Sequence, residues 1–275
     1  MSPTTIPGKM TLAREFTVQD YMWSFPQQYG LWSPAEITTA LWLDAADEST
    51  ITESGGAVSQ WDDKSGNDNH VAQSTSTLRP VVASNVLNSK PVIRFDGTDD
   101  RLETAGTLLA TPVFGVYSVT ANRNPSGQSS WAGQYIKDDL GRTLVYQNGI
   151  NTRLAAIFDA SAGINVTGTA NSSFHLFGYE KNLNNGNLYY EAVNVGTSSS
   201  FSTAISNTSW KIGESAAGSG GLTFPAALDA AEIVILFAPA LTSDRQKIEG
   251  YLAHKWGLTA NLPAGHPYKI VGPTP

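Results

Sequence analysis

The feature that most constrains the fold is a succession of short strand-like runs separated by turn signals. The runs are rich in β-branched and aromatic residues, for example "AVSQW", "PVIRF", "FGVYSVTA", "FHLFGYE" and "AEIVILF". Turn-forming segments such as "KSGND", "RNPSGQ" and "LNNGN" lie between them. Charged residues make up only 15% of the chain, which suits strands and tight turns better than a helical bundle. The sequence therefore predicts an all-β protein, built as a two-sheet antiparallel jelly-roll sandwich.

One segment near the C-terminus, "LTSDRQKIEGYLAHKWGL", has helical periodicity instead. Its apolar residues recur on one face, at Ile248, Tyr251, Leu252 and Trp256. Thr242 or Ser243 is the expected N-cap, and Gly257 is the expected C′ residue. This pattern predicts a helix that lies across the sandwich and buries its aromatic stripe.

The first 32 residues carry no repeating pattern but are rich in aromatic side chains. Six aromatics fall within seventeen positions: Phe16, Tyr21, Trp23, Phe25, Tyr29 and Trp32. Exposing so much apolar surface is costly, and disordered segments are poor in aromatics. Two cations, Lys9 and Arg14, balance Glu15 and Asp20, so the segment is neutral. We therefore expect residues 1–32 to be an extended arm that docks against its own domain or anchors the chain to a neighbouring subunit, with the six aromatics as partner-binding residues.

Residues 33–275 are expected to form one domain, since all-β folds of this length commonly stay undivided. Ser33 and Glu36 form a capping box that predicts a short helical turn. The segment "ALWLDA" then predicts the first buried strand.

Three groups of segments carry a resemblance to a known family. They are "LWLDA" at 41–45, "VSQWDDKSGNDNHVAQ", "RPVV" and "PVIRFDGTDDRLE" within 58–103, and "SDRQKIEGYLAHKWGL" with "LPAGHPYK" at 243–269. Together they resemble the laminin G-like, concanavalin A-like jelly rolls found in many bacterial and bacteriophage proteins. The resemblance implies that the two acidic segments are structural turns at one end of the sandwich. It says little about function, because this architecture hosts lectins, glycanases and structural modules.

The acidic loop "DDKSGNDNH" is a candidate metal site. Counted from Asp63, its spacing suits calcium at the first positions, but Asp68 and Ser74 stand where an EF-hand needs glycine and glutamate. We interpret it as a turn in which Asp62 and Asp63 cap backbone amides. Calcium stays open as the weaker alternative, shared with the loop "DGTDD", and no other cofactor is indicated. The candidate calcium ligands are Asp62, Asp63, Asp68 and Asp99.

The chain lacks the residue patterns of common catalytic sites. Retaining glycanases of concanavalin A-like architecture resemble one another in a Glu-x-Asp-x-Glu strand, and no such triplet occurs here. Asp229 and Glu232 are three residues apart, which places them on opposite faces of a regular strand. Neither H-E-x-x-H nor Gly-x-Ser-x-Gly occurs. We expect a protein that is not an enzyme.

Sugar binding is a separate hypothesis. Lectin sites place aromatic platforms beside Asn and Asp, and the segments "SSWAGQYIKDDLGR" and "LVYQNGINTR" offer both. The candidate glycan-binding residues are Trp131, Tyr135, Asp138, Tyr146 and Asn148. The alternative is that these aromatics pack into the sandwich core.

Composition narrows the remaining functions. The net charge of −7, without a basic patch, argues against nucleic acid as the partner. No apolar run is long enough for a membrane span, no signal peptide is evident, and there are no cysteines. The first hypothesis is a non-enzymatic bacteriophage virion protein, made in the host cytoplasm, that serves as head decoration or cement or is tail-associated. Its arm would bind other virion proteins and copies of itself. The second hypothesis is a carbohydrate-binding module for a cell-surface glycan.

Overall fold

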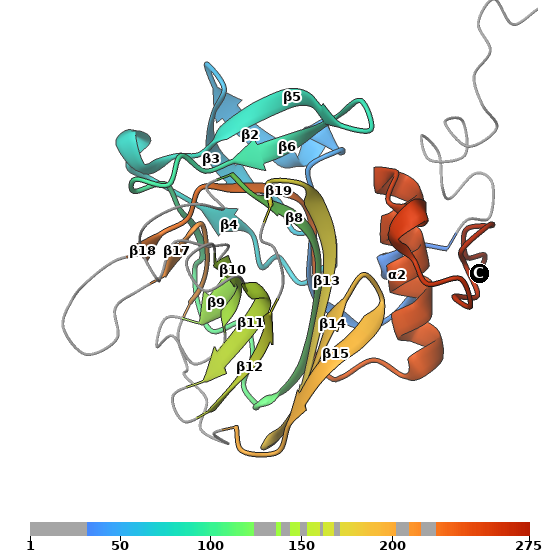
Figure 1. Ribbon diagram of the computed structural model, residues 1–275. Coiled ribbons are helices and arrows are strands. Elements are labelled where there is room, and N and C mark those ends of the chain that lie inside the picture. Colours follow the sequence, from blue (N-terminus) through green and yellow to red (C-terminus); the bar gives the residue numbers. More distant parts are fainter. Residues whose placement is uncertain are drawn as a thin grey trace, which may run out of the picture.

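The computed structural model describes residues 32–123, 136–138, 144–148, 153–159, 162–167, 171–201, 209–215 and 224–275. Within these ranges the strand pairings are antiparallel, and the strands form two layers packed face to face (Figure 1). The predicted all-β antiparallel sandwich with a C-terminal helix is thereby confirmed.

The first layer follows the pairing order β1–β19–β8–β13–β14–β15. Its strands are β1 (Thr39–Asp44), β8 (Val113–Asn122), β13 (Phe174–Asn182), β14 (Asn185–Tyr190), β15 (Val193–Ser198) and β19 (Leu228–Leu236). Strand β1 is buried along its whole length, as the segment "ALWLDA" predicts.

The second layer follows the order β2–β3–β4–β7–β16–β9–β10–β11–β12. Its strands are β2 (Ile51–Ser54), β3 (Ala57–Trp61), β4 (Val71–Ala72), β7 (Leu102–Thr104), β9 (Ile136–Asp138), β10 (Leu144–Asn148), β11 (Arg153–Asp159), β12 (Ala162–Thr167) and β16 (Trp210–Ile212).

A hairpin connects the two layers at one end of the sandwich. Its strands are β5 (Val81–Leu87) and β6 (Lys90–Arg94). Strand β6 pairs with β19 of the first layer, and β5 pairs with β3 of the second. The remaining short elements are β17 (Glu214–Ser215), β18 (Phe224–Pro225) and the 3-10 helices η2 (Pro34–Glu36), η3 (Glu48–Thr50), η4 (Ser76–Leu78) and η5 (Thr259–Asn261). The capping box around η2 is present as predicted, with the Ser33 N–H donating to Glu36 Oε1 at 3.1 Å.

The helix α2 (Thr242–Trp256) packs on the outer face of the first layer (Figure 1). Two apolar clusters result, one between the layers and one between the first layer and α2. Trp61, Phe95 and Trp210 are among the largest side chains of the inner cluster. Trp256 is fully buried in the outer cluster, as the helical stripe predicts. Among the described residues, no helix has the length and apolar content needed to cross a bilayer.

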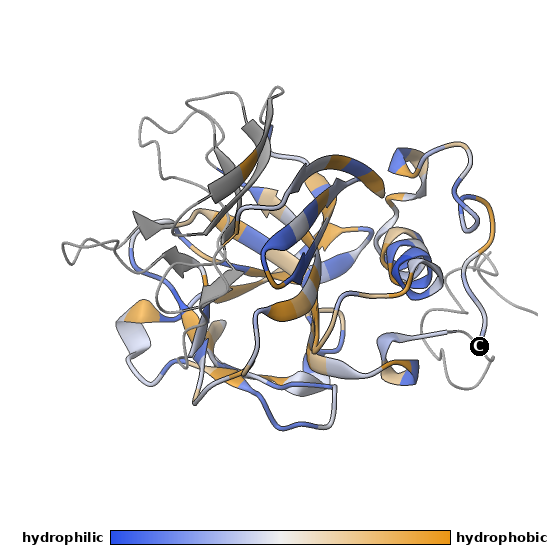
Figure 2. Ribbon diagram, turned by 90° about the horizontal axis from the view of Figure 1, so that it is seen from below, coloured by the Kyte–Doolittle hydropathy of each residue, from blue (hydrophilic) through white to orange (hydrophobic). Residues whose placement is uncertain are grey.

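The ends of α2 match the sequence expectation only in part. Gly257 adopts the left-handed conformation, with φ of 74°, and closes the helix as predicted. The predicted N-cap is wrong, because Leu241 occupies that position and no side chain caps the helix. The helix begins with the hydrogen bond from the Arg245 N–H to the Leu241 carbonyl, at 2.9 Å. Figure 2 shows that α2 is coloured mostly as hydrophilic, so apolar packing alone does not account for its docking.

Candidate functional site

The acidic loop covers the edge of β1 that does not pair with β19. The Asp63 carboxylate accepts the Trp42 N–H of β1 at 2.8 Å. It also accepts the N–H groups of Ser65 at 2.8 Å and Asn69 at 3.0 Å. The Lys64 N–H in turn donates to the Trp42 carbonyl at 2.8 Å. Asp63 thus caps backbone amides, as the sequence predicts, and its oxygens are used to fasten this loop to β1.

Two asparagine side chains of the same loop extend the cover along β1. The Asn67 amide donates to the Thr39 carbonyl, and the Asn69 amide donates to the Ala40 carbonyl, each at 2.8 Å. An unpaired strand edge is a template for aggregation, and natural sheets cover such edges. The asparagines of the loop therefore take the place of a neighbouring strand.

The other two acids of the loop do not join Asp63. Asp62 accepts a hydrogen bond from the Gln60 side chain at 2.7 Å rather than capping a backbone amide. Asp68 is exposed, at a φ of 57°, with its carboxylate 4.0 Å from the His70 ring. Asp62 Oδ1 also lies 3.6 Å from the His70 ring, so these two acids share a histidine neighbour while the Asp63 carboxylate binds backbone amides.

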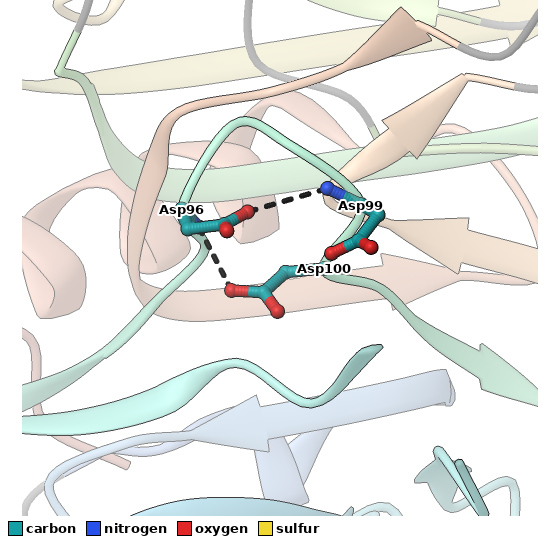
Figure 3. Close-up of side chains that lie close together, drawn as sticks. All are labelled: Asp96, Asp99 and Asp100. Atoms are coloured by element: carbon teal, nitrogen blue, oxygen red, sulfur yellow. Dashed lines mark hydrogen bonds between the residues drawn. The ribbon is translucent and has the colours of Figure 1, made fainter. Parts of the chain in front are cut away.

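The loop "DGTDD" brings three carboxylates together. The side-chain oxygens of Asp96, Asp99 and Asp100 lie within 4.8 Å of one another (Figure 3). The Asp96 N–H donates to Asp100 at 2.8 Å, and the Asp99 N–H donates to Asp96 at 3.3 Å. The pKa of Asp100 is raised to about 6, mainly by burial and also by the charges of Asp96 and Asp99, which together outweigh the hydrogen bond from the Asp96 N–H. Oxygen ligands of this kind suit calcium. The acids of the first loop are not part of this group, so the two loops do not assemble a shared site.

A buried ion cluster, which the sequence analysis does not anticipate, lies under α2. It consists of Asp44 on β1, Glu232 on β19 and Lys255 on α2. The Lys255 ammonium contacts Asp44 Oδ1 at 2.5 Å and Glu232 Oε2 at 2.7 Å. Asp44 and Glu232 are register partners across the two strands. All three are buried, with Glu232 completely so.

Aromatic donors complete the hydrogen bonding of Glu232. Its Oε1 accepts the Trp42 indole N–H at 2.7 Å and the Tyr251 hydroxyl at 2.9 Å. Its Oε2 accepts the Trp256 indole N–H at 2.7 Å. Burial and the nearby Asp44 charge raise the pKa of Glu232, against the opposing charge of Lys255. The pKa of Asp44 is lowered, because the attraction of Lys255 and Lys64 outweighs the effect of burial. This arrangement holds α2 to the sheet and leaves Glu232 no exposed surface for a substrate.

The sequence analysis places Asp229 and Glu232 on opposite faces of a regular strand, but β19 is not regular. The register of β19 against β8 shifts between Ala230 and Glu232, so Ala231 is an extra residue. The bulge breaks the alternation, and both Ala231 and Glu232 face α2. Asp229 forms a bidentate pair with Arg94, at 2.7 and 2.8 Å. The carboxylate beside Glu232 is therefore Asp44 rather than Asp229. The sequence feature that could have indicated a buried acid here is the single glutamate inside the apolar run "AAEIVILF".

Trp32 belongs to the core of its own domain. It is 1% exposed and makes an edge-to-face contact with Tyr251 of α2, with ring centroids 6.0 Å apart. The Trp32 N–H donates to the Pro273 carbonyl at 3.3 Å. The aromatic pattern assigns Trp32 to a partner contact, and its burial against α2 corrects that assignment. The other predicted arm residues lie outside the described residues: Phe16, Tyr21, Trp23, Phe25 and Tyr29.

The predicted glycan-binding residues fall on or near two neighbouring strands. Asp138 ends β9, while Tyr146 and Asn148 belong to β10. The two strands pair through Lys137 and Leu144 and are antiparallel, so Asp138 lies to one side of this pairing and Tyr146 and Asn148 extend from it in the other direction. Trp131 and Tyr135 lie outside the described residues.

An open groove of about 590 Å³ lies where β1, β19 and α2 meet. Its walls are residues 35–38 before β1, the last residue of β19 with the following residues 237–241, and Asp244 in the first turn of α2. Phe237 and Leu241 are 42% and 72% exposed, so apolar surface is open to solvent here. The groove has a size typical of ligand sites, and the buried ion cluster does not line it.

No protein-family model matches the chain, and a search of curated proteins finds no match. Solved structures with a similar fold include a GH54 α-L-arabinofuranosidase soaked with a cyclic sulfate inhibitor, at a TM-score of 0.53 and 10% identity. They also include the receptor-binding domain of botulinum neurotoxin mosaic serotype C/D, at a TM-score of 0.54 and 10% identity. A third is from work on botulinum neurotoxin type C, whose cell entry depends on interaction with two ganglioside molecules, at a TM-score of 0.54 and 11% identity.

The matches cover 82%, 79% and 80% of this chain but only 60%, 51% and 53% of those proteins. This chain therefore spans little more than half the length of the structures it resembles. At such low identity the similarity shows the β-sandwich fold alone.

Proposed function

We propose that this chain is a non-enzymatic attachment module: a jelly-roll sandwich that residues 1–31 hold on a larger assembly. The observation that carries the proposal is the burial of Trp32 against α2, which gives the preceding segment a fixed root on the domain. That segment contains five aromatics, far more apolar surface than a free tail normally exposes. A rigid root and an aromatic-rich segment together suit anchoring to a partner protein.

The assembly we propose is a bacteriophage virion, with head decoration or a tail-associated position as the role. The laminin G-like resemblance of the sequence supports this assignment, because such domains occur in many phage proteins. The absence of a Glu-x-Asp-x-Glu strand and the enclosed position of Glu232 support a role without catalysis. In this role the partners are other virion proteins and copies of the same chain.

Particle binding by an arm variant tests the proposal. Phe16, Tyr21, Trp23, Phe25 and Tyr29 are replaced together by Ser, and co-sedimentation with phage particles that carry the chain is measured. Burial of one large aromatic contributes about 2–3 kcal/mol, so we expect the variant to leave the particles. The matched control is Trp32→Phe, which keeps an aromatic at the root and should stay attached. Undiminished binding of the five-residue variant would show that the arm is not the anchor.

Carbohydrate binding is the second candidate function. The pairing of β9 with β10 favours it, because Asp138, Tyr146 and Asn148 then fall on adjacent strands of one sheet. Proteins of the same fold whose cell entry depends on gangliosides also support it, through fold analogy alone. A glycan array probed with the full chain tests this function. Signals that Tyr146→Ala abolishes would support it, and an array without signals would contradict it.

A further inference from the structure

The groove between β1, β19 and α2 offers an apolar docking surface at the base of the arm. Its exposed apolar side chains, Phe237 and Leu241, flank a wall that also contains Ile37, Pro239 and Ala240. The groove begins at Ala35, three residues after the buried root at Trp32. Large apolar side chains grouped in a groove mark an interaction site more often than single exposed ones do.

The charges of the groove complement those of the arm. Two acids line it, the exposed Glu36 and the half-buried Asp244. Asp244 also lies in the first turn of α2. Residues 1–14 carry Lys9 and Arg14 and no acid, so the distal part of the arm is basic. The aromatic part, residues 16–29, follows directly.

The arm is long enough to reach another molecule. Thirty-one residues span roughly 100 Å when fully extended, whereas a domain of this size has a radius of gyration of roughly 18 Å. From Trp32 the chain runs toward the groove through Ser33, whose backbone is extended. The Trp32 N–H donates to the Pro273 carbonyl, which does not line the groove. Trp32 and the groove therefore lie close together on the domain, and residues 1–31 have the length to reach the same face of a second copy.

We propose that residues 1–31 of one copy dock in the groove of a second copy, and that the exchange is reciprocal. Because root and groove lie side by side, a twofold axis at this face brings each root to the other copy's groove. The aromatics of residues 16–29 then contact Phe237 and Leu241, while Lys9 and Arg14 lie toward Glu36 and Asp244. This inference rests on the proposed attachment function and names its partner as a copy of this chain.

Disulfide trapping tests the contact, since the chain has no cysteine of its own. One sample carries Leu241→Cys, a second carries Phe25→Cys, and the two are mixed and mildly oxidised. We expect a mixed disulfide dimer, identified by mass spectrometry. The matched control replaces Leu241→Cys with Val81→Cys, which is also exposed but lies at the opposite end of the sandwich, in the hairpin. Equal trapping by the control would overturn the proposal. A third sample carries both Leu241→Cys and Phe25→Cys in one chain, and the proposal is also wrong if this variant forms only an intrachain disulfide.

Self-association separates this inference from the proposed function. The variant Phe237→Ser, Leu241→Ser should associate at least about tenfold more weakly than the unaltered chain in sedimentation velocity, since two apolar contacts are lost per groove. Val81→Ser should not change the association. An unaltered chain that is monomeric at every concentration, or a groove variant that associates as before, would overturn arm exchange. If the five-aromatic variant nevertheless leaves the particles, attachment through the arm still stands.

Discussion

Removing the cation from the buried ion cluster is expected to be among the most damaging single changes in the described part of the chain. In Lys255→Met the side chain keeps a similar length but loses its ammonium group. In the native protein the Lys255 ammonium lies 2.5 Å from the Asp44 carboxylate and 2.7 Å from the Glu232 carboxylate. In the variant the two carboxylates face each other across β1 and β19 without this shared partner.

The expected loss follows from the burial of these groups. Breaking a buried ion pair by removing one partner costs about 3–5 kcal/mol, because the remaining charge is left uncompensated in a poorly solvated site. Here two carboxylates share the one lysine, and one of them, Glu232, has no solvent-exposed surface. We therefore expect a loss of about 4 kcal/mol in the free energy of unfolding, a large part of the total stability of a typical domain.

The loss should also depend on pH. Without Lys255, burial and mutual repulsion raise the pKa of the carboxylate pair in the folded state above its value in the unfolded state. A raised folded-state pKa means stability that is present at low pH and is lost as the pH rises through that pKa. The deficit of Lys255→Met relative to the native chain should therefore be larger at pH 8 than at pH 5. Urea unfolding followed by tryptophan fluorescence measures it at both pH values.

Lys64→Met is the matched control. Lys64 also pairs with Asp44, at 2.9 Å, but its side chain is 23% exposed and a second partner, Asp47, is at the surface. Its removal leaves Lys255 in place and should cost about 1 kcal/mol, as a partly solvated pair does. Equal losses in the two variants, or a Lys255→Met deficit that grows as the pH falls, would refute the reasoning.

Three further changes test other parts of the structure. Asp63→Ala removes the acceptor for three backbone amides and should cost about 2–3 kcal/mol in urea unfolding, whereas Asp68→Asn at an exposed position should change stability by less than about 0.5 kcal/mol. Trp256→Ala should cost about 3–5 kcal/mol in the same measurement, because a fully buried side chain leaves a cavity. The pKa of Asp100, raised to about 6, contributes stability that is lost as the pH rises from about 4 to about 6, and Asp100→Asn should remove this part of the pH profile. We also expect that calcium will not raise the melting temperature of the native chain by more than a few degrees, and a large increase that Asp99→Asn abolishes would establish a calcium site instead.

Local patterns predicted the elements whose physics is local. The apolar runs and the turns between them predicted the strands. The spacing of Tyr251 and Trp256 predicted the buried face of α2, and Gly257 predicted its C-terminal end. The N-cap of α2 was misplaced because Thr242 and Ser243 are favoured N-cap types, whereas Leu241, which occupies the position, has no side-chain acceptor.

The buried ion cluster was not predictable because it depends on distant pairing. Trp42 and Glu232, which share a hydrogen bond, are 190 residues apart in the chain. Their meeting requires the pairing of β1 with β19 and the bulge at Ala231, neither of which leaves a short-range signal. Asp63 was the opposite case, since a turn rich in Asp, Ser, Gly and Asn caps amides within its own neighbourhood.

The buried ion cluster also limits where this sandwich can bind a ligand. Because α2 is fastened to the outer face of the first layer by Lys255, the part of that face under α2 is closed to partners. The inner faces of both layers form the core between them. In the described part of the chain, two candidate surfaces are the outer face of the second layer, which includes β9 and β10, and the groove beside Trp32. A glycan and a second copy of this chain would therefore bind at different places, and neither function would exclude the other.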